Sequence, residues 1–477
     1  MKILLVRPPV PRFTIGLKHI MICEPLELEY VAAGLAGHDV KIVDLIIEKN
    51  FVRKLKDFKP DVVGTSAYIT GVNEVIKICR IVKNHNPDCL TVVGGVHASI
   101  SPEDFADRSV DLIVLGDGIT KMREIVDNLF DGKSFETIKG LAIVEGENKI
   151  QMTPLCEYMK DPDTLPFPRR DLVSHLRNKY YYLFHQPVTL MKTTWGCWYK
   201  CNFCFTWKVT GGTPYSRSPE SIVEEIETIS TKDIYIVDDI FLINPKRLLR
   251  IAGLLKERNI EKKYLVYSRA DFVCENEDII KIWADIGLSA VIIGLEAATD
   301  PELDAMNKQC TVDYNRRSIE ILKKYDIDTY GSLIPLPDYS EKDWNRLMDF
   351  ILETGLYYVN ISPLTPMPGT EIWPIYKDQI SVSRQAFPLW DLSHTVLPTK
   401  LPLKHFYKLL LKTYAKTCLD TRRLKLIRRT RPAFLSYKYL RLWLGAVRIF
   451  FQLKSAHRHH SKRNIRIAEN RKVKCKI

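Results

Sequence analysis

Three cysteines, Cys197, Cys201 and Cys204, stand close together in the aromatic stretch WGCWYKCNFCFTW. The spacing C-x3-C-x2-C puts three thiols on one short loop, a pattern typical of metal or redox chemistry. Zinc would need a fourth ligand, but the next cysteine is Cys274 and no histidine follows until His394. Iron–sulfur clusters are also usually held by four thiolates, so three would leave one iron open to a small molecule. Zinc and three unligated thiols are the alternatives.

The cysteine loop follows a predicted strand at 188–194, which opens a series of alternating strands and helices. This alternation predicts a partial or full (β/α) barrel, with chemistry on the loops that follow the strands. The further strands are expected at 233–239, 263–271, 289–297, 328–336 and 357–366.

The first 130 or so residues carry a second alternating pattern, with helical stretches such as 73–85 between β-branched runs. It predicts a doubly wound, Rossmann-like parallel sheet, in which ligands bind at the carboxyl ends of the strands. The strands are expected at 2–8, 40–44, 61–68, 90–95 and 111–118. Small residues at their ends would let a ligand approach the backbone, although ordinary tight turns are the alternative; they are Thr65, Ser66, Gly94, Gly95 and Gly116.

The length of 477 residues is too great for one ordinary core, and 46% hydrophobic with 27% charged residues is typical of a folded chain. Four prolines between 154 and 168 indicate a linker. We therefore expect an α/β fold with a sheet domain at 1–135, a linker at 136–185, a barrel at 186–385 and a basic, helical region at 386–477.

Charge is distributed unevenly along the chain. The net charge is +13, but residues 401–477 hold 22 Lys and Arg against two acids, and residues 1–400 are net negative. Such a basic region typically meets an anionic partner, either nucleic acid or a membrane surface.

A helix is expected within 432–454, where Lys438, Arg441, Gly445, Arg448 and Gln452 form one narrow, weakly apolar stripe. Nearly all other positions are large and apolar, which favours a helix lying in the plane of a membrane interface. A core helix with a basic edge is the alternative. We find no RNA-binding module and expect no nucleic acid partner; the run HRHH that follows is interpreted as a solvated tail.

The cysteine spacing, with Phe203 just before the last cysteine, resembles the signature of the radical S-adenosylmethionine enzymes. The resemblance covers about 185–385 and includes VDDIFLINPKR, YSRAD and GLEAATD. It implies a [4Fe-4S] cluster whose open iron binds S-adenosylmethionine, a radical derived from that cofactor, and a low-potential electron donor of the flavodoxin or ferredoxin type. Family logic puts Arg269 and Glu296 near the cofactor, although core salt bridges are the alternative.

The N-terminal stretches GTSAYITG, VVGGVHASISPEDF and LGDG resemble the cobalamin-binding domain of one subgroup of that family. This resemblance implies that the small residues at the strand ends hold cobalamin. The D-x-H-x-x-G motif that supplies a histidine to cobalt in other cobalamin proteins is absent, as in many members of the subgroup, and His97 lies in a different context.

The stretch TIGLKHIMICEPLELEYVAAGL resembles the hopanoid C-3 methylase group most. The resemblance implies methyl transfer from methylcobalamin to an unactivated carbon of a lipid. The basic region is then expected to meet the membrane surface. With no secretory h-region at the N-terminus and scattered single cysteines, we expect a cytoplasmic enzyme, peripheral on the inner face of the membrane. The alternatives are an oxidative cyclase or other modification of a tetrapyrrole or isoprenoid, and a non-catalytic, cofactor-sensing protein.

Overall fold

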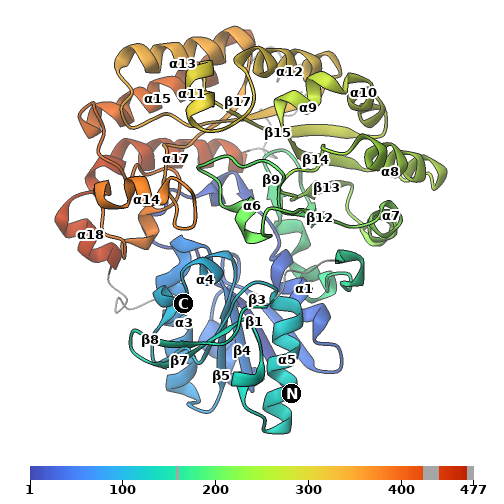
Figure 1. Cartoon of the computed structure of the whole chain (residues 1–477), viewed down its shortest axis with the longest axis vertical. Coiled ribbons are helices and arrows are strands. Elements are labelled where there is room, and N and C mark those ends of the chain that lie inside the picture. The colour runs from blue at the N-terminus through green and yellow to red at the C-terminus, as the bar shows by residue number, and fades with distance from the viewer. Residues whose placement is uncertain (157–160, 423–439, 470–477) are drawn as a thin grey trace.

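The computed structural model describes residues 1–156, 161–422 and 440–469, which build two sheets and a helical C-terminal region (Figure 1). The first sheet has seven strands in the order β3-β1-β4-β5-β6-β7-β8. In chain order these are β1 (Lys2–Arg7), β3 (Asp39–Asp44), β4 (Val62–Ser66), β5 (Leu90–Gly94), β6 (Leu112–Val114), β7 (Leu141–Gly146) and β8 (Lys149–Met152). Its helices are α1 (Leu26–Gly34), α2 (Phe51–Phe58), α3 (Val72–His85), α4 (Val96–Ile100) and α5 (Gly118–Asp131).

The first five strands of this order are parallel and buried on both faces. On β1, Ile3 and Leu5 pack in a core with α1 and α5, whereas Leu4 and Val6 pack in a core with α2 and α3. Burial on both faces explains why these strands are continuous apolar runs. The predicted doubly wound sheet is confirmed.

Strands β7 and β8 extend this sheet beyond the expected domain end at residue 135. They pair antiparallel to β6 and to each other, within the segment expected to be a linker. Only two residues lie between β7 and β8, so a tight hairpin joins them. The four prolines at 154–168 therefore lie in the part of the expected linker that follows this hairpin.

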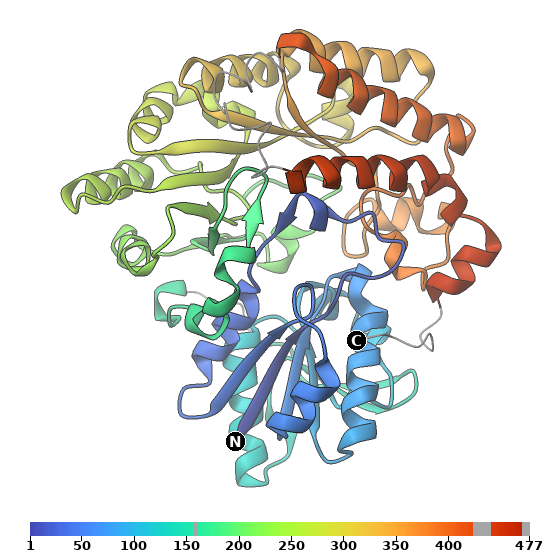
Figure 2. The same ribbon diagram turned by 180° about the vertical axis from the view of Figure 1, so that it is seen from behind.

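The second sheet contains six parallel strands in the order β10-β13-β14-β15-β16-β17 and curves into a partial barrel (Figures 1 and 2). The strands are β10 (Val188–Met191), β13 (Asp233–Ile236), β14 (Lys263–Ser268), β15 (Leu288–Glu296), β16 (Asp328–Leu333) and β17 (Tyr358–Ile361). The helices are α6 (Thr206–Val209), α7 (Pro219–Thr228), α8 (Pro245–Glu257), α9 (Ala270–Glu275), α10 (Glu277–Asp285), α11 (Asp300–Ala305), α12 (Val312–Lys324), α13 (Glu341–Thr354) and α14 (Trp373–Tyr376). Each barrel strand occupies a segment that the sequence predicted.

Two short ribbons complete the strand inventory and tie distant segments together. Strand β2 (Met21–Ile22) pairs with β9 (Tyr181–Tyr182), and β11 (Thr194–Trp195) pairs with β12 (Tyr215–Ser216). The first ribbon brings the N-terminal part of the chain to the start of the barrel.

A buried ionic network joins the segment before α1 to the start of the barrel. The carboxylate of Glu24 accepts hydrogen bonds from Arg177 and from the backbone N–H of Leu190 on β10. Arg170 binds Glu225 on α7 at 2.5 Å, and Glu24 and Glu225 are both fully buried. Because breaking one partner of a buried pair leaves an uncompensated charge, this network fixes the segment before α1 against the start of the barrel.

The C-terminal region folds as helices α15 (Leu403–Leu419), α17 (Leu440–His459) and α18 (Lys462–Glu469). Helix α15 packs on α13, and α17 packs on α15 and on the 3-10 helix Leu17–His19. Within the described residues, none of the helices combines the length and apolarity needed to cross a membrane. Residues 432–439, part of the predicted helix, lie outside the described residues.

The interpretation of the HRHH run as a solvated tail is wrong. His459 at the end of α17 lies 2.9 Å, Nδ1 to Nε2, from His394, which is itself fully buried and bonded to Asp391 at 3.0 Å. The ring of His460 lies 6.0 Å from that of His394. No local pattern marks this cluster, because His394 and His459 are 65 residues apart in the chain.

Candidate cofactor site

The cysteine loop runs from β10 to α6 and is held by backbone contacts from two other segments. Asn202 donates from Nδ2 to the carbonyl of Ala305 at 2.7 Å, and Asn307 donates from Nδ2 to the carbonyl of Lys200 at 2.7 Å. The N–H of Glu371 binds the carbonyl of Asn202 at 3.0 Å. These bonds fix the loop before any ligand binds.

The three thiols differ in exposure, but the pKa of each is raised. Cys201 is buried, whereas Cys197 and Cys204 are half-buried, as is Phe203 between them. Burial raises the pKa of Cys197 to about 11 and also raises the pKa of Cys201 and Cys204. Protein alone therefore favours the thiols, and a cationic iron centre is what would favour the thiolates.

The donor set fits a four-iron cluster better than a single ion. Throughout the part of the chain that the structure describes, no three His, Cys, Asp or Glu side chains are arranged around one metal ion. In a four-iron cluster each thiolate binds its own iron. Cys197, Cys201 and Cys204 would then each bind one iron of such a cluster.

A buried ion pair stands beside Cys201. Lys308 donates from Nζ to Oε1 of Glu296 at 2.8 Å, and both side chains are less than a tenth exposed. Both charges act on the thiol of Cys201. Glu296 ends β15 with a φ of 61°, a strained conformation for this residue type and one concentrated at functional sites. A side chain at Gly294 would clash, since its Cβ would come 2.3 Å from Oε1 of Glu296.

Arg269 is engaged with protein groups on several sides. It binds Asp271 at 2.8 Å and the carbonyls of Lys308 and Gln309 at 2.7 and 2.9 Å. Its guanidinium carbon lies 3.5 Å from the ring centre of Tyr199 in the cysteine loop. Arg269 thus ties the end of β14 to the cysteine loop, and its place near the cofactor stays a prediction.

Two adjacent aspartates after β13 hold the start of the cysteine loop. Buried Asp238 accepts hydrogen bonds from the backbone N–H groups of Thr193 and Thr194, at 2.6 and 2.9 Å. Asp239 accepts from the N–H of Gly196 at 2.7 Å. These residues lie in the stretch VDDIFLINPKR, but no local pattern marks them as site residues.

The small residues of the first sheet gather at one edge, because β4, β5 and β6 are neighbours and parallel. Thr65 is 4% exposed and its Oγ1 has no partner within the described structure. Gly95 has a φ of 103°, and a Cβ there would come 3.2 Å from the backbone of Ala67. Gly116 has a φ of 89° and open space where a side chain would stand. An orphaned hydroxyl beside an open glycine edge fits a large ligand laid against the backbone.

The remaining predicted residues at this edge make local contacts. Ser66 donates to Glu27 at 3.3 Å, and Gly94 ends β5 opposite Ser66. His97 is buried and lies 2.8 Å from Asp104, which also binds Arg384 at 2.7 Å. His97 is therefore part of a contact with the C-terminal region.

Tyr68 shows that this edge faces the barrel. Its side chain is 72% exposed, yet protein groups of both domains surround it. That enclosure raises the pKa of Tyr68 to about 12, and Glu27, Tyr267 and Asp239 contribute to the shift. An exposed side chain that lies near groups of both domains marks the gap between them.

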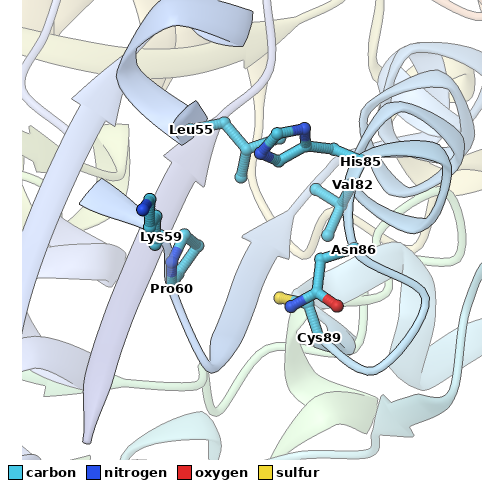
Figure 3. Close-up of a pocket in the computed structure, with 7 residues that line it drawn as sticks. All are labelled: Leu55, Lys59, Pro60, Val82, His85, Asn86 and Cys89. Atoms are coloured by element: carbon cyan, nitrogen blue, oxygen red, sulfur yellow. The ribbon is translucent and has the colours of Figure 1, made fainter. Parts of the chain in front are cut away.

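A pocket of about 230 Å³ lies at the opposite edge of the first sheet (Figure 3). Lys59 and Pro60 precede β4 and Cys89 precedes β5, so they mark the amino ends of these strands. It is thus remote from the edge that carries Thr65 and Gly95.

Tyrosines gather on the inner side of the barrel strands. The hydroxyls of Tyr235 and Tyr267 lie 2.6 Å apart. The ring of Tyr182 lies 5.0 Å from Tyr235 and 5.7 Å from Tyr330, which in turn lies 5.1 Å from Tyr358. This tyrosine cluster offers flat apolar faces with polar tips, which suits a largely apolar substrate.

Comparison with known proteins agrees with both halves of this arrangement. The family models for the radical SAM superfamily and the B12 binding domain match residues 191–351 and 15–126. Hopanoid C-3 methylase from Methylococcus capsulatus is 31% identical over 421 residues, covering 87% of this chain and 79% of the methylase. The chain belongs to the cobalamin-binding radical S-adenosylmethionine enzymes.

Two further relatives show the range of this family. An anaerobic magnesium-protoporphyrin IX monomethyl ester cyclase from Rubrivivax gelatinosus is 26% identical, covering 74% of this chain and 65% of the cyclase. The solved radical S-adenosylmethionine methyltransferase TsrM from Kitasatospora setae is 17% identical with a TM-score of 0.63, covering 79% of this chain and 78% of TsrM. The chain is a cobalamin-dependent radical S-adenosylmethionine methyltransferase, with a [4Fe-4S] cluster, S-adenosylmethionine and cobalamin as cofactors.

Lys308 is the site residue that sequence reasoning missed most clearly. It stands outside every quoted motif, in a loop between α11 and α12, and no local pattern marks it. Its role depends on a contact with Glu296 that exists only in the folded chain.

Proposed function

We propose that this enzyme methylates an unactivated carbon of a lipid, and that the lipid is a hopanoid methylated at C-3. The similarity to hopanoid C-3 methylase supports the substrate class. The observation that carries the proposal is the tyrosine cluster inside the barrel, whose flat rings suit a polycyclic hydrocarbon better than a charged substrate.

In this proposal Cys197, Cys201 and Cys204 hold the cluster, with Phe203 packed in the same loop. The Glu296–Lys308 pair, which occupies the space beside Gly294, stands at the S-adenosylmethionine side of the loop, and Arg269 positions the loop through Tyr199. Thr65, Ser66, Gly94, Gly95 and Gly116 form the cobalamin edge.

When bound, the cofactors supply a hydrogen-abstracting radical and a transferable methyl group. The chain's own residues hold the substrate between the two domains, which replaces a three-body encounter by a fixed geometry. The buried tyrosines exclude water from that space. The proposed partners are a low-potential electron donor and a membrane surface, with the enzyme in the cytoplasm on the inner face of the membrane.

The test is an anaerobic assay of the reconstituted protein with S-adenosylmethionine, reductant and a hopanoid-containing lipid extract. We expect a hopanoid heavier by one CH2, with S-adenosylhomocysteine and 5′-deoxyadenosine formed in equal amounts. Formation of 5′-deoxyadenosine without S-adenosylhomocysteine would instead favour cyclase-type chemistry, the second candidate, which the similarity to the protoporphyrin ester cyclase supports.

A further inference from the structure

Helix α17 presents a row of large apolar side chains away from the rest of the molecule. Leu440, Leu444, Val447 and Phe451 are 46%, 51%, 52% and 59% exposed, and Phe450 beside them is 42% exposed. The first four are spaced by four, three and four residues, so they form one continuous stripe, which we name the outer stripe.

The opposite face of α17 is fixed against the protein. Leu442, Gly445 and Leu453 are buried on it. Gly445 approaches the carbonyl of His19 so closely that a Cβ would come 2.4 Å from that oxygen. Arg441 lies over the ring of Tyr181, 3.2 Å from its centre. This close backbone approach means that the helix cannot simply roll to bury the outer stripe.

Cations continue the outer stripe toward the C-terminal end of the helix. Lys454 and Arg458 follow Phe451 by three and seven residues, and both are exposed. Arg448, next to Val447, is exposed as well. Glu469 is the one acid in the sequence of 440–469, so this apolar surface has a basic border.

We propose that the outer stripe of α17 lies in the interface of a membrane that contains anionic lipids. The apolar side chains would enter the acyl boundary while Lys454 and Arg458 meet the headgroups. No described helix can cross a membrane, so the helix lies in the plane of the interface. A second copy of the chain is the poorer occupant, because it brings the same excess of cations and no complementary negative charge.

The position of α17 connects this surface with the barrel interior. Tyr181, under Arg441, is followed on β9 by Tyr182, which packs on Tyr235 and Tyr330 in the tyrosine cluster. A membrane at the outer stripe would therefore lie beside the wall of the substrate space. This link to a lipid substrate rests on the proposed function, whereas the docking surface itself does not.

Vesicle co-sedimentation of the full chain tests the surface without any turnover. The probes are phosphatidylcholine vesicles with phosphatidylglycerol and phosphatidylcholine vesicles alone. We expect the unchanged protein to bind the anionic vesicles, and the double variant L444D/F451D to bind them about tenfold more weakly or less. The variant K454E/R458E should lose the preference for anionic over neutral vesicles.

The matched control is F130D, because Phe130 on α5 is 76% exposed but lies on the cobalamin-binding domain. Its vesicle binding should equal that of the unchanged protein. Thermal unfolding by circular dichroism checks that each variant is folded, as expected for substitutions at exposed positions.

Absence of binding by the unchanged protein, or equal binding by L444D/F451D, overturns the proposal. A dimer that L444D/F451D converts to a monomer, without vesicle binding, assigns the surface to a second copy and also overturns it. Since no hopanoid or cofactor turnover is measured, failure of this proposal is distinguishable from failure of the proposed reaction.

Discussion

Strand β15 and helix α17 are both rich in large apolar residues, but β15 buries them whereas α17 leaves many of them exposed. On β15, Val291, Ile293 and Leu295 are fully buried beneath the barrel helices. On α17, Leu444 and Phe451 are more than half exposed, while Gly445 faces the protein. Apolar content shows that a face will be covered, but not whether the chain itself covers it.

The charged residues of the two regions also differ in burial. Lys308 and Glu296, beside β15, are buried and paired at 2.8 Å, whereas Lys454 and Arg458 on α17 are exposed. A buried pair is costly to break, and an exposed cation contributes little to folding. Substitutions in the two regions should therefore separate function, stability and binding.

The largest effect is expected at the cysteine loop. Cys201→Ala removes one of the three thiols and should reduce 5′-deoxyadenosine formation to the background of the assay, because the cluster loses a ligand. Iron content and the absorbance of the reconstituted cluster give an independent measurement. The prediction fails if the variant forms 5′-deoxyadenosine at the rate of the unchanged enzyme.

The buried ion pair should come next. Lys308→Met leaves the Glu296 carboxylate buried without its cation, and we expect the free energy of unfolding to fall by about 3–5 kcal/mol. Urea unfolding measures this change. The matched control is E296Q/K308M, which removes both charges and should recover part of the loss; equal destabilisation of the single and double variants would contradict the pairing.

A pair of leucine substitutions sharpens the comparison directly. Leu295→Ala opens a cavity in the barrel core and should cost about 2–5 kcal/mol. Leu444→Ala, on the outer stripe, should change the free energy of unfolding by no more than about 0.5 kcal/mol. Urea unfolding of both variants checks this, and a large loss for Leu444→Ala would mean that the stripe is covered within the folded chain.

The smallest effect is a pH dependence at the end of α17. Burial, followed by repulsion from His394, lowers the pKa of His459 and of His460 to about 4. Asp391, His457 and Tyr407 are the other titratable groups around them. Since both histidines titrate near 6.5 when unfolded, the unfolded chain binds more protons between about pH 4 and 6.5, and stability should fall as pH falls through this window.

The melting temperature should thus drop by a few degrees between pH 7 and pH 5, a modest shift because both rings are partly exposed. The variant H459Q/H460Q provides the comparison, since its melting temperature should vary less with pH. An identical pH profile in both proteins would show that another group controls it. Asp391, whose pKa is lowered, loses its stabilising effect only below this window.

The sequence by itself determined the elements whose signals are local. The C-x3-C-x2-C spacing identified the loop, and apolar runs located the parallel strands, because a strand buried on both faces must be continuously apolar. Strands β7 and β8 extend the first sheet, and their pairing with β6 is visible only in the folded chain. The roles of the individual site residues stay predictions, as do the domain boundaries.

Only the tertiary structure decided which groups meet and which faces turn inward. Lys308 reaches Glu296, and His459 reaches His394, through contacts that no spacing in the sequence encodes. On α17 the sequence showed the pattern of large and small residues, but it did not show which face of the helix turns toward the protein. Close packing of Gly445 on His19 required the small residue inside, and Leu444 and Phe451 were thereby left exposed on the outer face.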